Sequence, residues 1–456
     1  MIDLTSTIAA ISTPSGMGGI AVIRASGKQA FDICDKIFVS SSRKKLFGQK
    51  TATAHFGKIV FENNVVDEVI ATVFHAPHSF TGENTVEISC HGSTYIQQQI
   101  LQALIHSGAS MAQPGEFTMR AFLNGKIDLA QAEAVGDLIA SSTRSMHSVA
   151  MQQMRGGYSN DIRSLRDKLL HFVSMIELEL DFTDEDVEFA DRDELKKLLQ
   201  EIITLIAKLT DSFSVGNAIK RGVPVAIVGA PNVGKSTLLN ALLNDEKALV
   251  SDIEGTTRDA IEDTITLGGA LFRFIDTAGI RHSTDYVENL GIERTYEKMA
   301  KAAIVILLLD ATRHETLKSV EEIQLQLTPE QKLIIAVNKV DNPSTLSSQF
   351  STLNHIALSA KNKTGLQELE QTLLKHAAIP DNLERNSVVS NARHYEAFIH
   401  AQQALIRALE GLGSNLSEEL IAFEIREAIQ HLSSIMGDIS DNDILGNIFE
   451  KFCIGK

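Results

Sequence analysis

The order of hydrophobic and polar positions divides the chain into stretches with different periods. Up to about residue 120, short runs rich in β-branched residues lie between Gly, Pro and Ser turns, which predicts strands at Ile20–Ile23, Val69–Phe74 and Thr85–Ser89. From about Asp128 onward, apolar residues recur at i, i+3, i+4 and i+7, the pattern of amphipathic helices. Two such stripes comprise Leu169, Phe172, Val173, Ile176 and Leu180, and then Leu195, Leu198, Leu199, Ile202, Ile203 and Ile206.

The pattern changes again near Arg221. Strand-like runs then alternate with helical runs to about residue 378, which is typical of a parallel sheet with helices on both faces. The predicted strands are Val223–Val228, Leu271–Ile275, Ile304–Leu309 and Leu333–Val337. Helical periodicity returns after Pro380, in Ala401–Leu409 and Glu418–Leu432. We therefore expect the helices before residue 216 and after residue 385 to form one domain, with the α/β module inserted at an exposed loop.

A phosphate-binding motif follows the strand that ends at Val228. Residues 229–236 read Gly-Ala-Pro-Asn-Val-Gly-Lys-Ser and match GxxxxGK[ST] between a strand and a helix-like run, which is the context the motif requires. The glycines let backbone N–H groups turn toward phosphate oxygens, and the helix N-terminus adds its dipole. Lys235 is expected near the β- and γ-phosphates, and the Ser236 hydroxyl is expected to ligate Mg²⁺. The predicted binding residues are Asn232, Val233, Gly234, Lys235, Ser236 and Thr237.

Two later motifs identify the base. Asn338-Lys339-Val340-Asp341 ends an apolar strand, and the Asp341 carboxylate can accept hydrogen bonds from guanine N1–H and from its exocyclic amine. Adenine does not offer that pair of donors. Ser359-Ala360-Lys361 follows a short β-like run and resembles the loop behind the guanine ring in GTPases. The ordered motifs predict that the nucleotide is GTP.

Between these motifs lie two switch-like segments. Gly255-Thr256-Thr257-Arg258-Asp259 contains a threonine suited to Mg²⁺, and Asp276-Thr277-Ala278-Gly279 is expected to contact the γ-phosphate through Asp276 and the Gly279 amide. Loss of that phosphate releases such loops, which makes the domain a switch. The next residue is Ile280, which cannot orient the attacking water as the glutamine of many small GTPases does. Asp285 and Glu288 are the acidic candidates for that role.

Composition narrows the class of protein. The 456 residues carry 42 Lys plus Arg against 58 Asp plus Glu, a formal charge of −16, which disfavours a general basic surface for nucleic acid. The cysteines and histidines lack the spacing of a disulfide framework or a metal site, so we interpret His75, His78 and His91 as structural. We find no signal peptide, and the longest apolar run, Ala302–Leu309, is shorter than the roughly 20 residues that span a bilayer. We therefore expect a cytoplasmic protein that is not in a membrane.

Three further segments resemble the MnmE (or TrmE) family of tRNA modification GTPases. They are residues 13–24, which read TPSGMGGIAVIR, residues 114–129 with their Pro-Gly-Glu-Phe and Asn-Gly-Lys-Ile-Asp-Leu sequences, and the terminal Phe-Cys-Ile-Gly-Lys of residues 452–456. The resemblance covers the whole chain. It implies a multidomain α/β plus all-α fold. Residues 1–120 would form an N-terminal α/β domain for folate binding and dimerisation, and residues 121–216 and 381–456 would form the two parts of a helical domain. Residues 217–380 would form an inserted Ras-like P-loop GTPase domain with a doubly wound, mostly parallel sheet.

The resemblance also implies site residues. A tetrahydrofolate derivative, in the 5-formyl or the 5,10-methylene form, is expected at Arg24, Glu87, Lys126 and Lys456. Potassium is expected to replace the charge of an arginine finger, and Mg²⁺ to bind at Ser236 and Thr257. The expected potassium residues are Asn232 of the phosphate loop and Ser251, Ile253 and Thr256 of the switch segment. The whole switch segment is expected to contact the nucleotide; its residues are Ser251, Asp252, Ile253, Glu254, Gly255, Thr256 and Thr257. The expected catalytic residues are Glu288, which positions the water, together with Asn232 and Lys235.

The function implied by the resemblance is a homodimer that joins a flavin-containing MnmG-type partner in a heterotetramer. Together they would install a carboxymethylaminomethyl or aminomethyl group at C5 of wobble uridine 34 of certain tRNAs, with carbon from the folate and a conformational cycle driven by GTP. Cys453 is either a thiolate nucleophile or buried packing. The alternative function is a potassium-activated switch in ribosome assembly or RNA binding without covalent RNA chemistry, which would have no use for a folate pocket.

Overall fold

The structure is a computed structural model, and it forms two compact units. It describes residues 5–181, 191–243, 263–275, 296–297, 299–313, 316–341, 350, 353–380, 387–414, 416–438, 448–449, 452 and 455. The first unit comprises Met1–Ile139, Gln153–Arg166 and Leu432–Lys456, and the second comprises Ala140–Gln152 and Asp167–His431.

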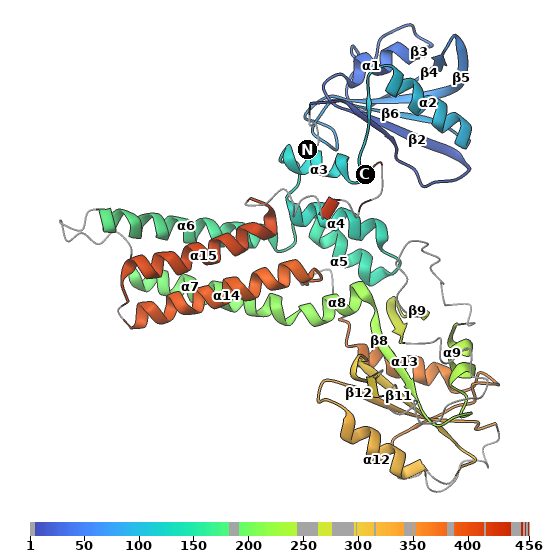
Figure 1. Ribbon diagram of the computed structural model, residues 1–456, viewed down its shortest axis with the longest axis vertical. Helices are drawn as coiled ribbons and strands as arrows, with labels where there is room; N and C mark the ends of the chain where they lie inside the picture. Colours follow the sequence, from blue (N-terminus) through green and yellow to red (C-terminus); the bar gives the residue numbers. More distant parts are fainter. Residues whose placement is uncertain are drawn as a thin grey trace. The chain divides into compact units, whose positions relative to one another are not determined.

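The first unit is built on a seven-stranded sheet with the order β3-β4-β5-β6-β2-β1-β7. Its strands are β1 (Ile8–Ile11), β2 (Gly18–Ser26), β3 (Phe38–Ser40), β4 (Thr53–Phe61), β5 (Asn64–Phe74), β6 (Thr85–Gly92) and β7 (Ser110–Met111). Neighbouring strands are antiparallel except for the parallel pair β1 and β7. Helices α1 (Ala30–Ile37) and α2 (Thr94–His106) cover one face of this sheet (Figure 1).

Strand alternation decides which side chains face the helices. Val86, Ile88 and Cys90 of β6 are buried in the core that α1 and α2 complete. Because successive side chains point to opposite faces, Glu87 faces the other side, beside its register partner Arg24 of β2. The face of the sheet opposite α1 and α2 therefore carries this charged pair.

Three more helices and the C-terminal residues complete the first unit. These helices are α3 (Glu116–Leu123), α4 (Leu129–Ala140) and the first part of α6 (Ser159–Asp181). The boundary that the sequence predicted at residue 120, between the N-terminal domain and the helical domain, falls inside α3. A Cβ on Gly455 would lie 2.2 Å from the Ile11 carbonyl, and the Ser12 hydroxyl donates to the Gly455 carbonyl at 3.1 Å. Gly455 thus lies against the end of strand β1.

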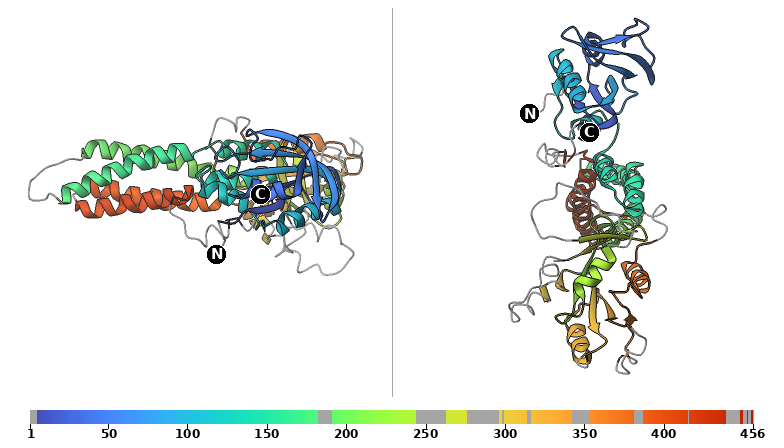
Figure 2. Two further views of the ribbon diagram at one scale, coloured as in Figure 1. Left: turned by 90° about the horizontal axis from the view of Figure 1, so that it is seen from above. Right: turned by 90° about the vertical axis from the view of Figure 1, so that its right-hand side faces the viewer.

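The helical part of the second unit includes α5 (Arg144–Met154), α7 (Arg192–Asp211), α8 (Phe213–Arg221), α14 (Ala392–Gly413) and α15 (Glu418–Met436). Helix α7 packs along α14, and α15 lies beside α6, where Arg426 pairs with Glu177 (Figure 2). Of the predicted stripe on α7 every residue except the half-buried Ile203 is buried, in agreement with its periodicity. Within the described residues one stretch, Arg192–Arg221, is long and apolar enough to cross a membrane by length and composition. Helix α7 supplies most of that stretch, and its apolar face lies in the protein core.

The inserted module has a six-stranded sheet of order β13-β12-β11-β8-β10-β9. Its strands are β8 (Val223–Val228), β9 (Asp263–Leu267), β10 (Ala270–Phe274), β11 (Ile304–Asp310), β12 (Lys332–Asn338) and β13 (Ile356–Ala357). All neighbours are parallel except β9 and β10. Apolar clusters cover both faces, one with α9 (Lys235–Leu243) and α13 (Leu366–Ala377), the other with α12 (Thr316–Gln326). The predicted multidomain α/β plus helical fold is confirmed.

The two chain segments that connect this module to the helices lie side by side. The Val389 N–H donates to the Ser212 hydroxyl at 3.1 Å across a sequence separation of 177 residues. A Cβ on Gly216 would lie 2.1 Å from the Val389 carbonyl, so only glycine permits this approach. Adjacent entry and exit segments are the geometry of an inserted domain.

Candidate nucleotide site and a second candidate pocket

The phosphate-binding loop connects β8 to α9. Gly229 has φ 150° and Gly234 has φ 101°, both in the region that favours glycine. A Cβ on Gly229 would lie 2.3 Å from the Leu308 carbonyl oxygen, and one on Gly234 would lie 2.3 Å from Asn338 Nδ2. Both glycines of the motif are therefore required by the fold as well as by phosphate access.

Lys235 spans this loop from the first residue of α9. Its Nζ donates to the Gly229 carbonyl at 2.7 Å and to the Ala230 carbonyl at 3.0 Å. The ammonium is thus held at the helix N-terminus, where the dipole and the loop amides also favour negative charge. This arrangement suits a nucleotide phosphate chain.

Asn338 connects the phosphate loop to the loop expected behind the base. Its Nδ2 donates to the Val233 carbonyl at 2.8 Å, and its Oδ1 accepts from the Ala360 N–H at 2.9 Å. The Asn338 residue is only 3% exposed. One buried carboxamide therefore fixes the spacing of the phosphate loop and the Ser359–Lys361 loop.

Lys339 makes a second connection, through Asp310. Its Nζ donates to the Asn232 carbonyl at 2.8 Å and to Asp310 Oδ2 at 2.7 Å. Asp310 Oδ1 accepts from the Thr312 amide at 3.0 Å and from the Thr312 hydroxyl at 2.7 Å. Burial by itself would raise the pKa of Asp310, but the hydrogen bonds and the charge of Lys339 outweigh it and lower the pKa. Asp310 is therefore an ionised anchor beneath the loop.

Asp341, the residue expected to recognise guanine, is also held in place. Its Oδ1 accepts from the Ser359 hydroxyl at 2.6 Å and from Asn362 Nδ2 at 3.4 Å. The Ser359 hydroxyl in turn accepts from the Asn362 N–H at 3.2 Å. These bonds orient a carboxylate at the carboxyl end of β12, where nucleotides bind in parallel α/β sheets.

The structure brings together the predicted residues of the phosphate loop and of the two base-recognition loops. Asp310, Thr312 and Asn362 complete this network, although the sequence did not single them out. A carboxylate at the last position of the apolar strand β11 was the available signal for Asp310. The remaining predicted residues lie outside the described residues: Ser251, Asp252, Ile253, Glu254, Gly255, Thr256, Thr257, Asp276, Thr277, Ala278, Gly279, Glu288 and Lys456, as does Cys453.

A second candidate pocket lies on the face of the first unit's sheet opposite α1 and α2. Arg24 donates to Glu87 Oε1 from Nε at 2.9 Å and from Nη2 at 2.8 Å. The guanidinium also lies over two rings, 5.3 Å from the centroid of Phe80 and 5.5 Å from that of Phe117. A cavity of about 250 Å³ opens beside this pair and is lined by Phe74, His78, Ser79, Phe80, Thr85 and Glu87.

Lys126 reaches the same region. Its Nζ donates to the Pro77 carbonyl at 3.0 Å, next to the cavity residues His78 and Ser79. Of the residues expected for folate, Glu87 lines the cavity, Arg24 pairs with Glu87, and Lys126 bonds the segment that carries His78 and Ser79. The volume of the cavity is just below the ~300–1,000 Å³ of typical small-molecule pockets. Two phenylalanine rings and one carboxylate therefore stand among the residues that line this cavity.

Other candidate chemistry is not supported in the described part of the chain. No group of three or more His, Cys, Asp or Glu side chains there is placed to hold a metal ion. His91 pairs with Asp67 at 2.8 Å on the sheet surface. Burial raises the pKa of the Cys90 thiol to about 11 and raises that of Cys34 further. Neither thiol is suited to act as a nucleophile at neutral pH.

Comparison with known proteins identifies the family. The family model described as the MnmE helical domain matches residues 129–453, and the one described as the GTP-binding protein TrmE N-terminus matches residues 7–126. A tRNA modification GTPase MnmE from Parabacteroides distasonis is 55% identical over 462 residues, which cover 99% of this chain and 100% of that protein. The chain belongs to the MnmE family of tRNA modification GTPases. The same name is carried by a Flavobacterium johnsoniae protein that is 52% identical, with 99% of each chain covered.

Membership in the MnmE family confirms two predictions, the family resemblance itself and a GTP-hydrolysing enzyme. Among solved structures, Aquifex aeolicus Era bound to GDP and AlF4⁻ is 28% identical, covers 40% of this chain and 66% of its own, and has a TM-score of 0.26. The MnmE relatives, in contrast, match over nearly the full length.

Proposed function

We propose that this MnmE-family chain hydrolyses GTP in order to modify the wobble uridine of tRNA. In this proposal it acts as a homodimer with a flavin-containing MnmG-type partner in a heterotetramer, in the cytoplasm. The product is uridine 34 of certain tRNAs with an aminomethyl or carboxymethylaminomethyl group at C5. The observation that carries the GTPase half is the Asn338 bridge, which joins the phosphate loop to the base-recognition loop.

The hydrolysis step needs a group in place of the missing glutamine. Glu288 is proposed to orient the attacking water, because Ile280 cannot. Mg²⁺ would be held by Ser236 and Thr257 and would neutralise charge on the β- and γ-phosphates. Lys235, at the N-terminus of α9, stabilises the same charge from the protein side.

Potassium is proposed to supply the charge of an arginine finger through Asn232 and the switch segment that contains Ser251, Ile253 and Thr256. Asn232 has φ 63°, a backbone conformation that asparagine tolerates better than most residues. Its carbonyl is already occupied by Lys339, so the side-chain oxygen is the atom to offer the ion. Binding of the ion by the paired G domains would couple hydrolysis to dimerisation.

The folate half rests on the cavity beside Arg24 and Glu87. Glu87 suits the N–H donors of a pterin ring, Phe74 and Phe80 suit its faces, and Lys126 suits the glutamyl carboxylate. Lys456 is proposed to join them, since Gly455 lies against Ile11 at the end of β1. A bound folate would supply the one-carbon unit, while these side chains bind and orient it.

The decisive experiment measures GTP hydrolysis in potassium and in sodium buffer at matched ionic strength. An Asn232→Gly variant is the control, because glycine keeps the backbone at φ 63° and removes only the side chain. Strong potassium activation that the variant loses supports the proposal. Equal rates in the two salts contradict the potassium role. Single-turnover hydrolysis that is unchanged in Glu288→Ala contradicts the role of that glutamate.

Modification itself is tested by mass spectrometry of nucleosides from tRNA after reaction with the partner, GTP and folate. Arg24→Ala should abolish the C5 product and leave GTP hydrolysis within about twofold. A product that forms at the normal rate without Arg24 contradicts the folate assignment. If GTP is hydrolysed normally and no C5 product forms under any condition, a role as a switch in RNA binding is favoured instead.

A further inference from the structure

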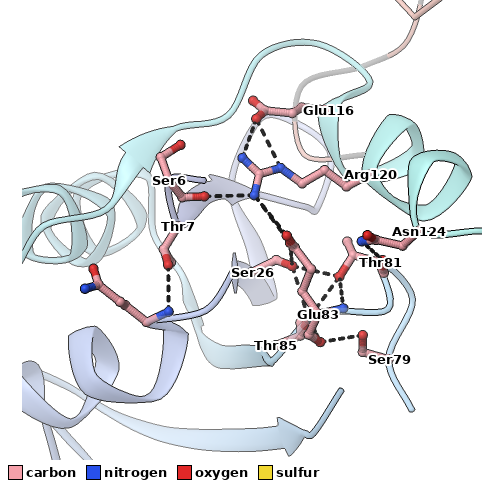
Figure 3. Close-up of polar contacts among 11 residues, drawn as sticks. Ser6, Thr7, Ser26, Ser79, Thr81, Glu83, Thr85, Glu116, Arg120 and Asn124 are labelled. Carbon is pink, nitrogen blue, oxygen red and sulfur yellow. Dashed lines mark hydrogen bonds and ion pairs between the residues drawn. The ribbon is translucent and has the colours of Figure 1, made fainter. Parts of the chain in front are cut away.

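A buried ionic network in the first unit surrounds Arg120 and Glu83 (Figure 3). At its centre is Arg120 of α3, which is 1% exposed. Arg120 Nη2 and Nε donate to Glu116 Oε1 at 2.7 and 3.2 Å. Arg120 Nη1 donates to the Ser6 carbonyl at 2.8 Å, and it also lies 3.3 and 3.4 Å from the two carboxylate oxygens of Glu83. Desolvation of a buried guanidinium is costly, and the bonds to Glu116, Glu83 and the Ser6 carbonyl offset that cost.

Glu83 connects Arg120 to the loop that forms the pocket. We name residues 75–84, between β5 and β6, the β5–β6 loop; it carries His78, Ser79 and Phe80 of the cavity wall. The backbone carbonyl of Glu83 accepts from the Ser79 hydroxyl at 2.6 Å. The side-chain Oε2 of Glu83 accepts from the Ser26 hydroxyl at 2.9 Å. One residue thus links the buried cation to both the loop and strand β2.

Two further bonds from the same helical segment hold the same loop. Asn124 Nδ2 donates to the Thr81 carbonyl at 2.8 Å, and Lys126 Nζ donates to the Pro77 carbonyl at 3.0 Å. A cluster of hydroxyls fills the space between, with the Ser26 and Thr81 oxygens 2.8 Å apart. The loop therefore takes its position from α3 and the turn after it.

The position of the loop matters because Phe80 lies on it. The Phe80 ring stacks on Arg24, whose charge pairs with Glu87 at the cavity. A shift of the loop would move one aromatic wall and one partner of Arg24 together. We propose that Arg120 and Glu83 are positioning residues that hold the β5–β6 loop so that Phe80 and Arg24 meet a folate in the cavity; this inference rests on the proposed folate function.

The test uses Glu83→Ala, because Arg120→Met would leave the buried Glu116 without its cation and could unfold the unit. In Glu83→Ala, Arg120 keeps Glu116 and the Ser6 carbonyl as partners. Glu83→Gln is the conservative variant, since its amide retains an oxygen for Arg120 and a donor for Ser26. Glu62→Gln, an exposed glutamate at the turn between β4 and β5, is the matched control.

The first measurement is calorimetric binding of 5-formyltetrahydrofolate to the full chain. We expect Glu83→Ala to weaken binding by about tenfold or more, the effect of losing a charge-assisted hydrogen bond that orders a site. Glu83→Gln should recover part of the loss. All variants should remain folded in thermal unfolding, and GTP hydrolysis should stay at wild-type values. Wild-type affinity in Glu83→Ala would overturn the inference.

The second measurement needs no ligand. The chain has no tryptophan, so a Phe80→Trp substitution provides a single fluorescent reporter on the loop. We expect Glu83→Ala in that background to increase acrylamide quenching and to shift the emission to longer wavelength, whereas Glu62→Gln leaves both unchanged. An unchanged reporter overturns the positioning role. If the wild type binds no folate, the proposed function fails, and the reporter still decides whether Glu83 holds the loop. If Glu83→Ala does not fold, Ser26→Ala replaces it with the same expected outcomes.

Discussion

The nucleotide site offers a prediction that depends on one side chain, Asn338. Changing Asn338 to Ala removes the donor to the Val233 carbonyl and the acceptor of the Ala360 N–H. Both of those residues are nearly buried, at 2% and 3% exposure. The variant therefore loses two hydrogen bonds and leaves two backbone groups without protein partners.

The size of the effect follows from those two groups. A buried polar group without a partner costs about 1–3 kcal/mol, so two groups cost about 2–6 kcal/mol. The space vacated by the side chain admits water to part of this region, which favours the lower half, about 2–4 kcal/mol. If the loss falls on the bound state, GTP affinity decreases by about 30- to 700-fold.

The assay is equilibrium titration with a fluorescent GTP analogue, with thermal unfolding measured in parallel to detect loss that falls on the fold instead. Asn362→Ala is the matched control, because Asn362 is exposed and its bond to Asp341 is 3.4 Å long. We expect the control to lose less than about threefold in affinity. If Asn338→Ala binds as tightly as the control and unfolds at the same temperature, the bridge does not fix the two loops and our reasoning is refuted.

Three further predictions concern stability. The pKa of Asp310 is lowered in the folded protein, so the stability that its ionised form contributes is complete above the ordinary value of 3.8 and is lost as the pH falls through the folded value. The difference in unfolding free energy between wild type and Asp310→Asn, measured with urea, should therefore shrink toward pH 3. A difference that stays constant with pH would contradict this. Gly229→Ala should lower the melting temperature markedly, since its Cβ would lie 2.3 Å from a backbone carbonyl, while Gly413→Ala, with open space around it, should not. Burial, the stacked His400 ring and the charge of Arg407 lower the pKa of His431 against the opposing charge of Glu427, so stability should fall as the pH drops below 6.5. His431→Gln should make that fall smaller in urea unfolding at pH 5.5 and 7.5, while His376, whose pKa is also lowered, keeps the rest.

Local patterns predicted the elements and the phosphate loop because their causes are local. The stripe on α7 and the continuous apolar run of β11 each follow from the burial of a single element. The glycines of residues 229–236 are likewise required by backbone conformation within one turn. Such features are readable from the chain alone.

The parts that sequence did not predict depend on contacts between distant segments. Asp310 meets Lys339 because β11 and β12 are parallel neighbours, and the ion pair joins residues 29 positions apart. The approach of Gly455 to Ile11 brings the two ends of the chain together across more than 440 residues, as the 443-residue separation of Ser12 and Gly455 shows. No local pattern encodes these meetings.

The Arg120 network is an intermediate case, since its signal was present in the sequence but was ambiguous. Glu116 and Arg120 are spaced i, i+4 in the otherwise apolar helix Glu-Phe-Thr-Met-Arg-Ala-Phe-Leu, and such a pair is usually a solvated surface contact. Here nearly the whole helix is buried, so the pair cannot be on the surface and must have internal partners. Asn338 follows the same logic, as a polar residue at the end of a buried strand. In each site a buried polar side chain, Arg120 or Asn338, fixes loops whose own sequences do not determine their positions. The Glu83 and Asn338 variants therefore test how the loops of the two sites are held in place.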